Sequence, residues 1–240
     1  MRKLLMKHSK YTLLGIAVIA LITGIWIALS PQMEKQNALA EQERLMESIT
    51  QGDGTITLDS KVTQTEPDFY EETPAFSNTG SAGEMFIPDV DTEAEDMPLI
   101  DSQEITGIGV LKISKIDLAL PVVDGVTKSK LKVAVGRVPR TAEIGSIGNA
   151  VIAGHRSYSF GKYFNRLGEL EIGDVIEYQS KDGKAMNFEV YNIRTIMPGD
   201  QSAFRQPKDF AEITLYTCTP IRVASHRLLI IARLIKEETK

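Results

Sequence analysis

The sequence has only one cysteine, Cys218, among its 240 residues. A single thiol excludes an intramolecular disulfide and every metal site built from four cysteines. Free cysteines are most often small buried hydrophobic residues, so a reactive role for this thiol needs support from its surroundings. The chain also has no basic cluster with interleaved aromatic residues, and we therefore expect no nucleic acid partner.

Lysine and arginine are absent from residues 62–111, where twelve acidic residues occur. This acidic segment cannot bury enough apolar surface to fold alone. We therefore expect residues 31–104 to form an extracytoplasmic stalk and acidic linker, beginning with a short polar helix at residues 32–46 that acts as a spacer. A second hypothesis makes residues 66–100 a lid that partly covers a basic active site by charge attraction.

One long uncharged run occurs, the 19 residues 11–29. As a helix it approaches the roughly 30 Å of a bilayer core, and four basic residues precede it, which favours a cytoplasmic N-terminus. The run is longer than the apolar region of a signal peptide, and residues 28–31 make a poor cleavage site. We predict that residues 1–30 form a basic cytoplasmic tip and a transmembrane anchor, which enters the lipid membrane through residues 11–29 and leaves the rest of the chain on the extracellular face.

From residue 105 onward the chain consists of short β-rich runs separated by turn signals. This texture predicts an all-β domain at residues 105–240, with short helices, of which residues 163–170 are the best candidate. Closure into a barrel or packing as a sandwich is favoured over an α/β fold. The expected strands are residues 109–113, 118–123, 149–153, 175–179, 186–196, 212–218 and 226–235.

Three residues in these runs have the chemistry needed for acyl transfer. Cys218 ends a predicted strand, Arg227 opens the next one, and His155 follows a glycine at the end of another. If the two consecutive strands pair antiparallel, the cysteine and the arginine meet at the same end of the sheet. A thiolate can attack a carbonyl carbon, an imidazole can move protons, and a guanidinium can stabilise negative charge that develops on oxygen.

The run TLYTC at residues 214–218, with Arg227 nine residues later, resembles the signature of the sortase family, and AGHR at residues 153–156 resembles the family's histidine segment. The likeness covers roughly residues 107–234. It implies a closed eight-stranded β-barrel and a cysteine transpeptidase without metal or organic cofactor. It also implies that Cys218, His155 and Arg227 are catalytic and that the enzyme cleaves an LPxTG-like sorting signal between Thr and Gly.

The resemblance also implies partners. These are surface proteins or pilins that carry the sorting signal, and an amine acceptor, which is either a cell-wall crossbridge or a pilin lysine. Cell-wall anchoring and pilus polymerisation both remain open as the biological role. The wall of the site is expected to include Thr217 and Ala153 as substrate-binding residues.

The same residues admit other assignments. Adjacent strand residues point to opposite faces, so His226 should point away from the site if Arg227 points into it. Arg156 is expected to be a wall or surface residue. A membrane-anchored cysteine peptidase would share the acyl-enzyme, and a non-catalytic adhesion domain would simply bury Cys218. The Ser-His-Gly-Cys cluster of L,D-transpeptidases is absent, and no paired carboxylates indicate a glycosidase.

Overall fold

The computed structural model describes residues 21, 23–24, 36–51, 54–59, 102–156, 163–221 and 223–235. The chain divides into two units, Met1–Ala40 and Glu41–Lys240, and the strands of the described residues all lie in the second. Within the described residues no helix combines the length and the apolar composition that a bilayer crossing requires. The predicted anchor at residues 11–29 lies almost entirely outside the described residues, and the predicted lid at residues 66–100 lies wholly outside them.

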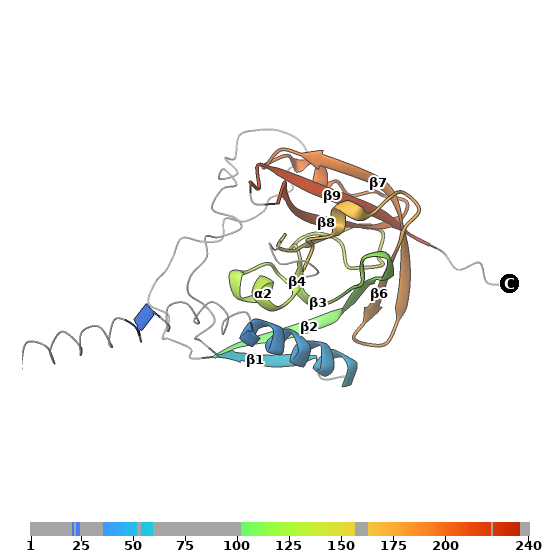
Figure 1. Cartoon of the computed structure of the whole chain (residues 1–240). Coiled ribbons are helices and arrows are strands. Elements are labelled where there is room, and N and C mark those ends of the chain that lie inside the picture. The colour runs from blue at the N-terminus through green and yellow to red at the C-terminus, as the bar shows by residue number, and fades with distance from the viewer. Residues whose placement is uncertain are drawn as a thin grey trace, which may run out of the picture. The chain divides into compact units, whose positions relative to one another are not determined.

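Eight strands form a closed barrel (Figure 1). Its hydrogen-bonded order is β2-β3-β4-β5-β8-β9-β7-β6, and β6 pairs back to β2 to complete the circle. The pairs β3–β4 and β5–β8 are parallel, and the others are antiparallel. The strands are β2 (Ser102–Ile113), β3 (Leu118–Asp124), β4 (Val135–Arg137), β5 (Gly148–Ala153), β6 (Val175–Ser180), β7 (Ala185–Ile196), β8 (Ala211–Thr219) and β9 (His226–Leu234).

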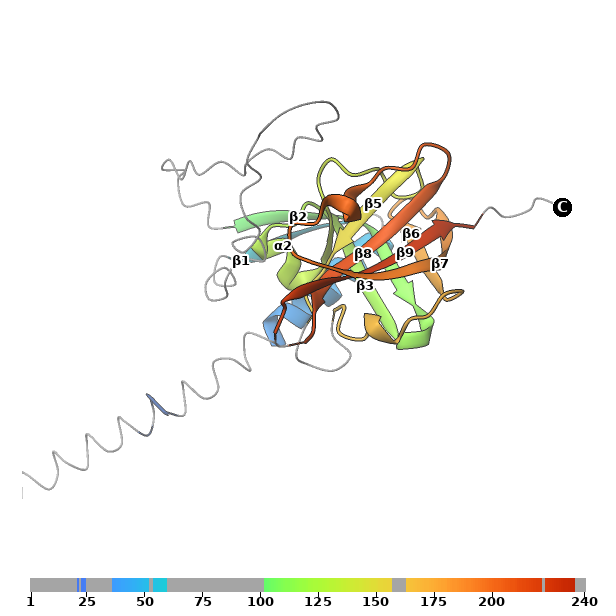
Figure 2. The same ribbon diagram turned by 90° about the horizontal axis from the view of Figure 1, so that it is seen from above.

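The predicted closed eight-stranded, mostly-β fold is therefore confirmed. Six of the seven predicted strands agree with the structure to within one residue at each end. The first is longer than predicted, because β2 begins at Ser102 rather than at residue 109. Strand β1 (Thr55–Asp59), the short helix α2 (Lys128–Val133) and strand β4 were not predicted. Helix α2, labelled in Figure 2, and β4 lie between β3 and β5 in the chain, and β4 pairs parallel with β3 and antiparallel with β5.

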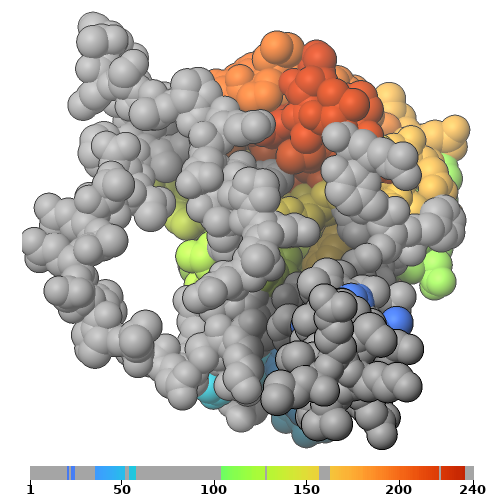
Figure 3. All heavy atoms as spheres, turned by 60° about the vertical axis from the view of Figure 1, so that its left-hand side comes forward, coloured from blue at the N-terminus to red at the C-terminus, as the bar shows by residue number. Residues whose placement is uncertain are grey.

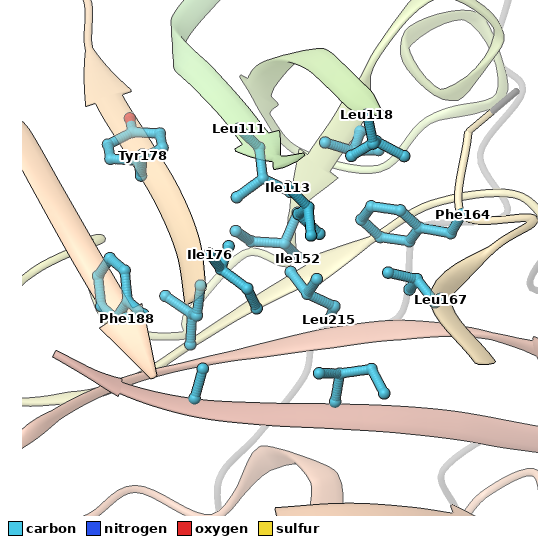
Figure 4. Close-up of a cluster of buried hydrophobic side chains, with 14 of the residues drawn as sticks. Leu111, Ile113, Leu118, Ile152, Phe164, Leu167, Ile176, Tyr178, Phe188 and Leu215 are labelled. Atoms are coloured by element: carbon cyan, nitrogen blue, oxygen red, sulfur yellow. The ribbon is translucent and has the colours of Figure 1, made fainter. Parts of the chain in front are cut away.

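Alternate residues of the strands fill the barrel interior. Ile152 of β5 and Leu215 of β8 lie side by side in a central cluster with Ile113 and Phe188 (Figure 4). Because successive strand residues point to opposite faces, the residues between these core positions face outward. The core therefore fixes which side chains of β5, β8 and β9 lie on the inner face and which lie on the outer face.

The outer face of β5, β8 and β9 carries a second apolar cluster, which includes Tyr216 and Leu229. The connection from β7 to β8 covers it, since Ala203 and Phe204 of the 3-10 helix η4 (Gln201–Phe204) belong to or pack against this cluster. Asn149 of β5 holds the connection in place by donating to the carbonyl oxygen of Ala203 at 3.0 Å. The outer face of these strands is thus covered by packed side chains up to the end of β8.

The helix at residues 36–51 is not the polar spacer that the sequence analysis expected. Leu45 and Ile49 are buried in a third apolar cluster together with Ile105, Val123 and Val133 of the barrel side. A Cβ on Gly107 would lie 2.3 Å from Ile49 Cδ1, so glycine at position 107 permits this contact. Strand β1 (Thr55–Asp59) adds to the N-terminal part of β2, outside the barrel.

The predicted helix at residues 163–170 was also wrong in its extent. Residues 163–166 form a turn, and only Leu167–Glu169 form a 3-10 helix, η3. Tyr163 has a φ of 48°, in the left-handed region, so a right-handed helix cannot begin there. Phe164 and Leu167 are three residues apart and both point into the core (Figure 4), a spacing that suits a tighter turn. The remaining short 3-10 helix is η2 (Ser114–Ile116).

Candidate active site

Cys218 lies on the outer face of the barrel near the end of β8. Ile213 and Leu215 of the same strand belong to the core cluster, and Tyr216 belongs to the outer cluster. Since alternate residues share a face, Cys218 points the same way as Tyr216. The cysteine is half-buried rather than sealed in the interior. Cys218 is therefore not the small buried hydrophobic residue that a non-catalytic adhesion domain would have at this position.

Arg227 is the direct neighbour of Cys218 in the β8–β9 ladder. The next residue, Leu228, is in the core cluster, so Arg227 faces outward with the cysteine. Its residue surface is only 3% exposed, and its Nη1 donates to the carbonyl oxygens of Ala224 at 2.8 Å and of His226 at 3.1 Å. The β8–β9 loop therefore holds this guanidinium beside the thiol.

His155 is placed next to Cys218 by the contacts of its two neighbours. The pairing of β5 with β8 is parallel and ends with Ala153 opposite Tyr216, so two further residues along each strand bring position 155 level with position 218. Gly154 donates its N–H to the carbonyl oxygen of Tyr216 at 3.1 Å. Arg156 donates to Thr219 Oγ1 at 2.6 Å. His155 is thus held between two contacts to β8 that lie on either side of the cysteine.

The segment after His155 supports the imidazole. The Tyr163 ring meets the His155 ring edge-on, with centroids 6.4 Å apart and an interplanar angle of 83°. Tyr163 is itself tied to α2, because its hydroxyl donates to the carbonyl oxygen of Lys132. Phe164 donates its N–H to the His155 carbonyl oxygen at 3.0 Å and anchors its own ring in the core. The loop that contains the histidine is therefore fastened to the core one residue after Tyr163.

Two residues that the sequence analysis expected to bind substrate are buried. Thr217 is fully buried, and its hydroxyl donates to the carbonyl oxygen of Gly154 at 2.7 Å. Ala153 is fully buried in the outer cluster. Neither side chain is exposed, and the Thr217 hydroxyl ties the end of β5, and so the approach to His155, to β8. The assignment of these two residues to substrate binding stays a prediction.

His226 behaves as the alternation predicts. It is paired with Thr219, one position beyond Arg227, and lies on the face of Leu228, opposite to the arginine. Its Nδ1 contacts Ser225 Oγ at 2.9 Å. The structure therefore brings His155, and not the histidine nearer in sequence, to the face of Cys218.

Tyr216 was not predicted to belong to the site, whereas Arg156 was expected to be a wall or surface residue, and it lies at the end of β8. Burial raises the pKa of Tyr216, and the neighbouring Arg227 guanidinium acts in the opposite direction, which places this phenol among the groups around Cys218. The signal for Tyr216 was present in the sequence, because a residue two positions before Cys218 in a strand must share its face.

Among the described residues no group of three or more His, Cys, Asp and Glu side chains is arranged to hold a metal ion.

A family model described as the sortase domain matches residues 111–235, which is more than half of the chain. The chain belongs to the sortase family. In Figure 3, orange-red residues of the C-terminal part of the chain lie above yellow-green residues from its middle part.

Relatives from several sortase subclasses are similar to this chain. Sortase SrtE1 of Streptomyces coelicolor is 28% identical in an alignment of 155 residues, and the match covers 56% of this chain and 42% of the relative. Sortase D of Bacillus subtilis is 30% identical over 112 residues, which are 47% of this chain and 54% of the relative. The chain thus spans about half the length of these curated relatives.

Solved sortase structures share the barrel. Sortase A from Corynebacterium diphtheriae superposes with a TM-score of 0.53 at 29% identity, covering 57% of this chain and 64% of the other. Sortase C-1 from Actinomyces oris gives 0.51 at 30% identity, covering 53% and 73%. Matches to sortases A, C, D and E of similar strength do not resolve a subclass.

Proposed function

We propose that the protein is a cysteine transpeptidase that cleaves an LPxTG-like sorting signal between Thr and Gly and transfers the threonyl acyl group to an amine. The observation that carries this proposal is the meeting of three groups on one outer face: Cys218 opposite Arg227 in the β8–β9 ladder, and His155 held level with Cys218 on the β5 side. A nucleophile, a proton carrier and a cationic donor at one rim are the components of acyl transfer.

In the first half of the reaction, the Cys218 thiolate attacks the threonine carbonyl carbon. The carbonyl oxygen takes up the electron pair, and the Arg227 guanidinium stabilises the resulting negative charge. His155, as imidazolium, protonates the glycine nitrogen as the C–N bond breaks, which leaves a thioester on Cys218.

In the second half, the amine acceptor attacks the thioester carbonyl. The neutral His155 takes a proton from the attacking nitrogen, the C–S bond breaks, and the Cys218 thiolate is regenerated beside a His155 imidazolium. Net charge and protons balance over the cycle, so no cofactor is needed. The partners are then proteins that carry the sorting signal, and either a cell-wall crossbridge amine or a pilin lysine.

The placement of the enzyme is part of the same proposal. Residues 11–29 anchor the chain in the membrane, residues 31–104 lead from the anchor to the barrel, and the catalytic domain at 105–240 works on the extracellular face. The uncharged length of the anchor run and the basic residues before it support this placement. Residues 66–100 act as a lid only if their acidic side chains lie on the site.

Mass spectrometry tests the proposal directly. The purified domain is incubated with a library of LPxTG-like peptides, with and without an oligoglycine amine. We expect a peptide thioester on Cys218 that is absent from Cys218→Ala, and a ligated product when the amine is present. Hydrolysis in the presence of the amine, with no ligated product, identifies a peptidase. No acyl adduct with any peptide overturns the proposal.

A further inference from the structure

Arg156 crosses from the segment that follows β5 to the end of β8. Its Nη1 donates to Thr219 Oγ1 at 2.6 Å and lies 3.5 Å from the carbonyl oxygen of Cys218. The residue immediately before it is His155. One side chain therefore joins the histidine-bearing segment to the two residues at the end of the cysteine strand.

The other side of this guanidinium lies against η3. A Cβ on Gly168 would lie 3.0 Å from Arg156 Nη2, so glycine at this position leaves the space that the guanidinium occupies. Arg166 is another arginine of the same connection, but it is directed elsewhere. Its Nη1 donates to the carbonyl oxygen of Ile116 at 2.8 Å, and its Nε and Nη2 donate to Glu169. The two arginines thus differ in placement while they have the same charge.

The charge of Arg156 has few partners to neutralise it. Within the described part of the chain it forms no ion pair with a carboxylate, and its buried Nε has no hydrogen-bond acceptor. Burial lowers the pKa of the Arg156 guanidinium, and the charge of Cys218 acts in the opposite direction. An arginine stays cationic in proteins, so a positive charge is held at the end of β8, 3.5 Å from the carbonyl oxygen of Cys218.

The groups that surround Cys218 come from three directions. Arg227 faces it from β9, Tyr216 from its own strand, and His155 and Arg156 from the segment after β5. Asp200, from the β7–β8 connection, acts on Tyr216. Arg156 and Arg227 carry the fixed positive charges in this set, and both favour the anionic form of the Cys218 sulfur.

We propose that Arg156 is a positioning residue that holds the His155 segment against the end of β8 and stabilises the thiolate form of Cys218. The inference rests on the assignment of Cys218 as nucleophile in the proposed function. It extends that function, because it gives the cysteine two flanking cations with separate tasks: Arg227 for the substrate oxygen and Arg156 for the sulfur.

The test measures the alkylation rate of Cys218 by iodoacetamide as a function of pH, read by mass spectrometry, and needs no substrate. For Arg156→Gln we expect the midpoint of the profile to rise by about 0.5 to 1 pH unit. Below the midpoint this corresponds to a loss of rate of roughly three- to tenfold. Arg156→Lys retains the charge and should restore most of the midpoint. Arg166→Gln, which removes the same charge from the other arginine, should leave the profile of the wild type.

Gly168→Leu provides a second route if Arg156→Gln folds poorly. The new side chain occupies the space of the guanidinium while Arg156 itself is retained, and we expect the midpoint to rise in the same direction by a smaller amount. Profiles of Arg156→Gln and Gly168→Leu that coincide with that of the wild type overturn the proposal. A midpoint shift without any peptide thioester would instead support the role of Arg156 and count against the transpeptidase function, so the two failures are distinguishable.

Discussion

The two strands beside β8 hold their functional side chains in different ways. Arg227 is inside a ladder, paired with Cys218 on one side and with Ile196 on the other, and it is almost fully buried. His155 lies two residues beyond the last pair of β5 and is half-exposed. The side of the site that we propose stabilises the oxyanion is therefore part of the barrel, whereas the side that we propose transfers protons depends on a few contacts at a strand end.

This contrast suits the two tasks. A charge that stabilises an oxyanion works best when it is fixed before the reaction, because no reorganisation is then needed. A group that donates a proton to one amine and accepts one from another must meet two substrates in turn. A substitution on the β9 side should therefore reduce rate and stability together, and one on the β5 side should reduce rate with little change in stability.

The largest effect is expected for His155→Gln. Loss of the general acid and base should lower kcat/KM for transpeptidation by about 10² to 10⁴, while the urea midpoint stays that of the wild type because the side chain is half-exposed. His226→Gln is the matched control, since His226 faces away from the site, and we expect it to stay within about twofold of wild type. Equal losses in the two variants would contradict the assignment of faces.

Arg227→Lys should be next in size. Lysine keeps the charge but lacks the planar fork of donors, and we expect kcat/KM to fall by about 100- to 1,000-fold. Unlike His155→Gln, this substitution removes buried hydrogen bonds to Ala224 and His226, so the free energy of unfolding should fall by roughly 1 to 3 kcal/mol. Urea unfolding of both variants compares the two sides. An unchanged unfolding free energy for Arg227→Lys would contradict the difference in stability that we expect between the β9 side and the β5 side.

A smaller effect is expected for Thr217→Val, which leaves the buried carbonyl oxygen of Gly154 without its hydroxyl donor. We expect a loss of roughly 1 to 3 kcal/mol in unfolding free energy and a further loss of about tenfold in kcat/KM, because the approach to His155 is loosened. Thr214→Val is the control, since that hydroxyl is also fully buried and donates to Asn149 of β5 at 2.9 Å, far from the site. It should lose similar stability and keep its activity.

The smallest effect is expected for Tyr163→Phe. The ring that meets His155 is kept, and only the hydroxyl that ties it to Lys132 of α2 is lost. We expect kcat/KM to fall by about two- to threefold, because a single half-buried hydrogen bond is removed. The contribution of Arg227 to the free energy of unfolding should not change. A loss as large as that of His155→Gln would mean that Tyr163 takes part in the chemistry itself.

Much of the barrel was readable from the sequence because alternation along a strand is a local pattern. Six predicted strands agree to within one residue, and the face of His226 followed from the same alternation. Strand β4 has only three residues, Val135–Arg137, which is too short to show a period. A polar spacer helix was expected at residues 32–46, because the local sequence does not show that Leu45 and Ile49 of the helix at residues 36–51 pack on the distant Ile105.

The site was predictable as far as residue types and strand ends allow. Cys218, Arg227 and His155 each stand at or near a strand end, and the ladder register adds their common face. The position of Arg156 depends on a contact with Thr219, 63 residues away, that no local pattern encodes. The hydrogen bond of the buried Thr217 likewise depends on Gly154, which follows β5 and is 63 residues away in the sequence. Long-range contacts of this kind appear only in three dimensions.

The most direct test of the common outer face is a crystal structure of the protein with a sorting-signal peptide analogue joined to Cys218 by a disulfide. We predict that the analogue lies on the outer face of β8, with the group that mimics the threonine carbonyl at hydrogen-bond distance from Arg227 and with the His155 imidazole on the opposite side of the sulfur. A structure in which Arg227 points into the barrel, or in which the imidazole lies beyond reach of the sulfur while the analogue is bound, would contradict the account.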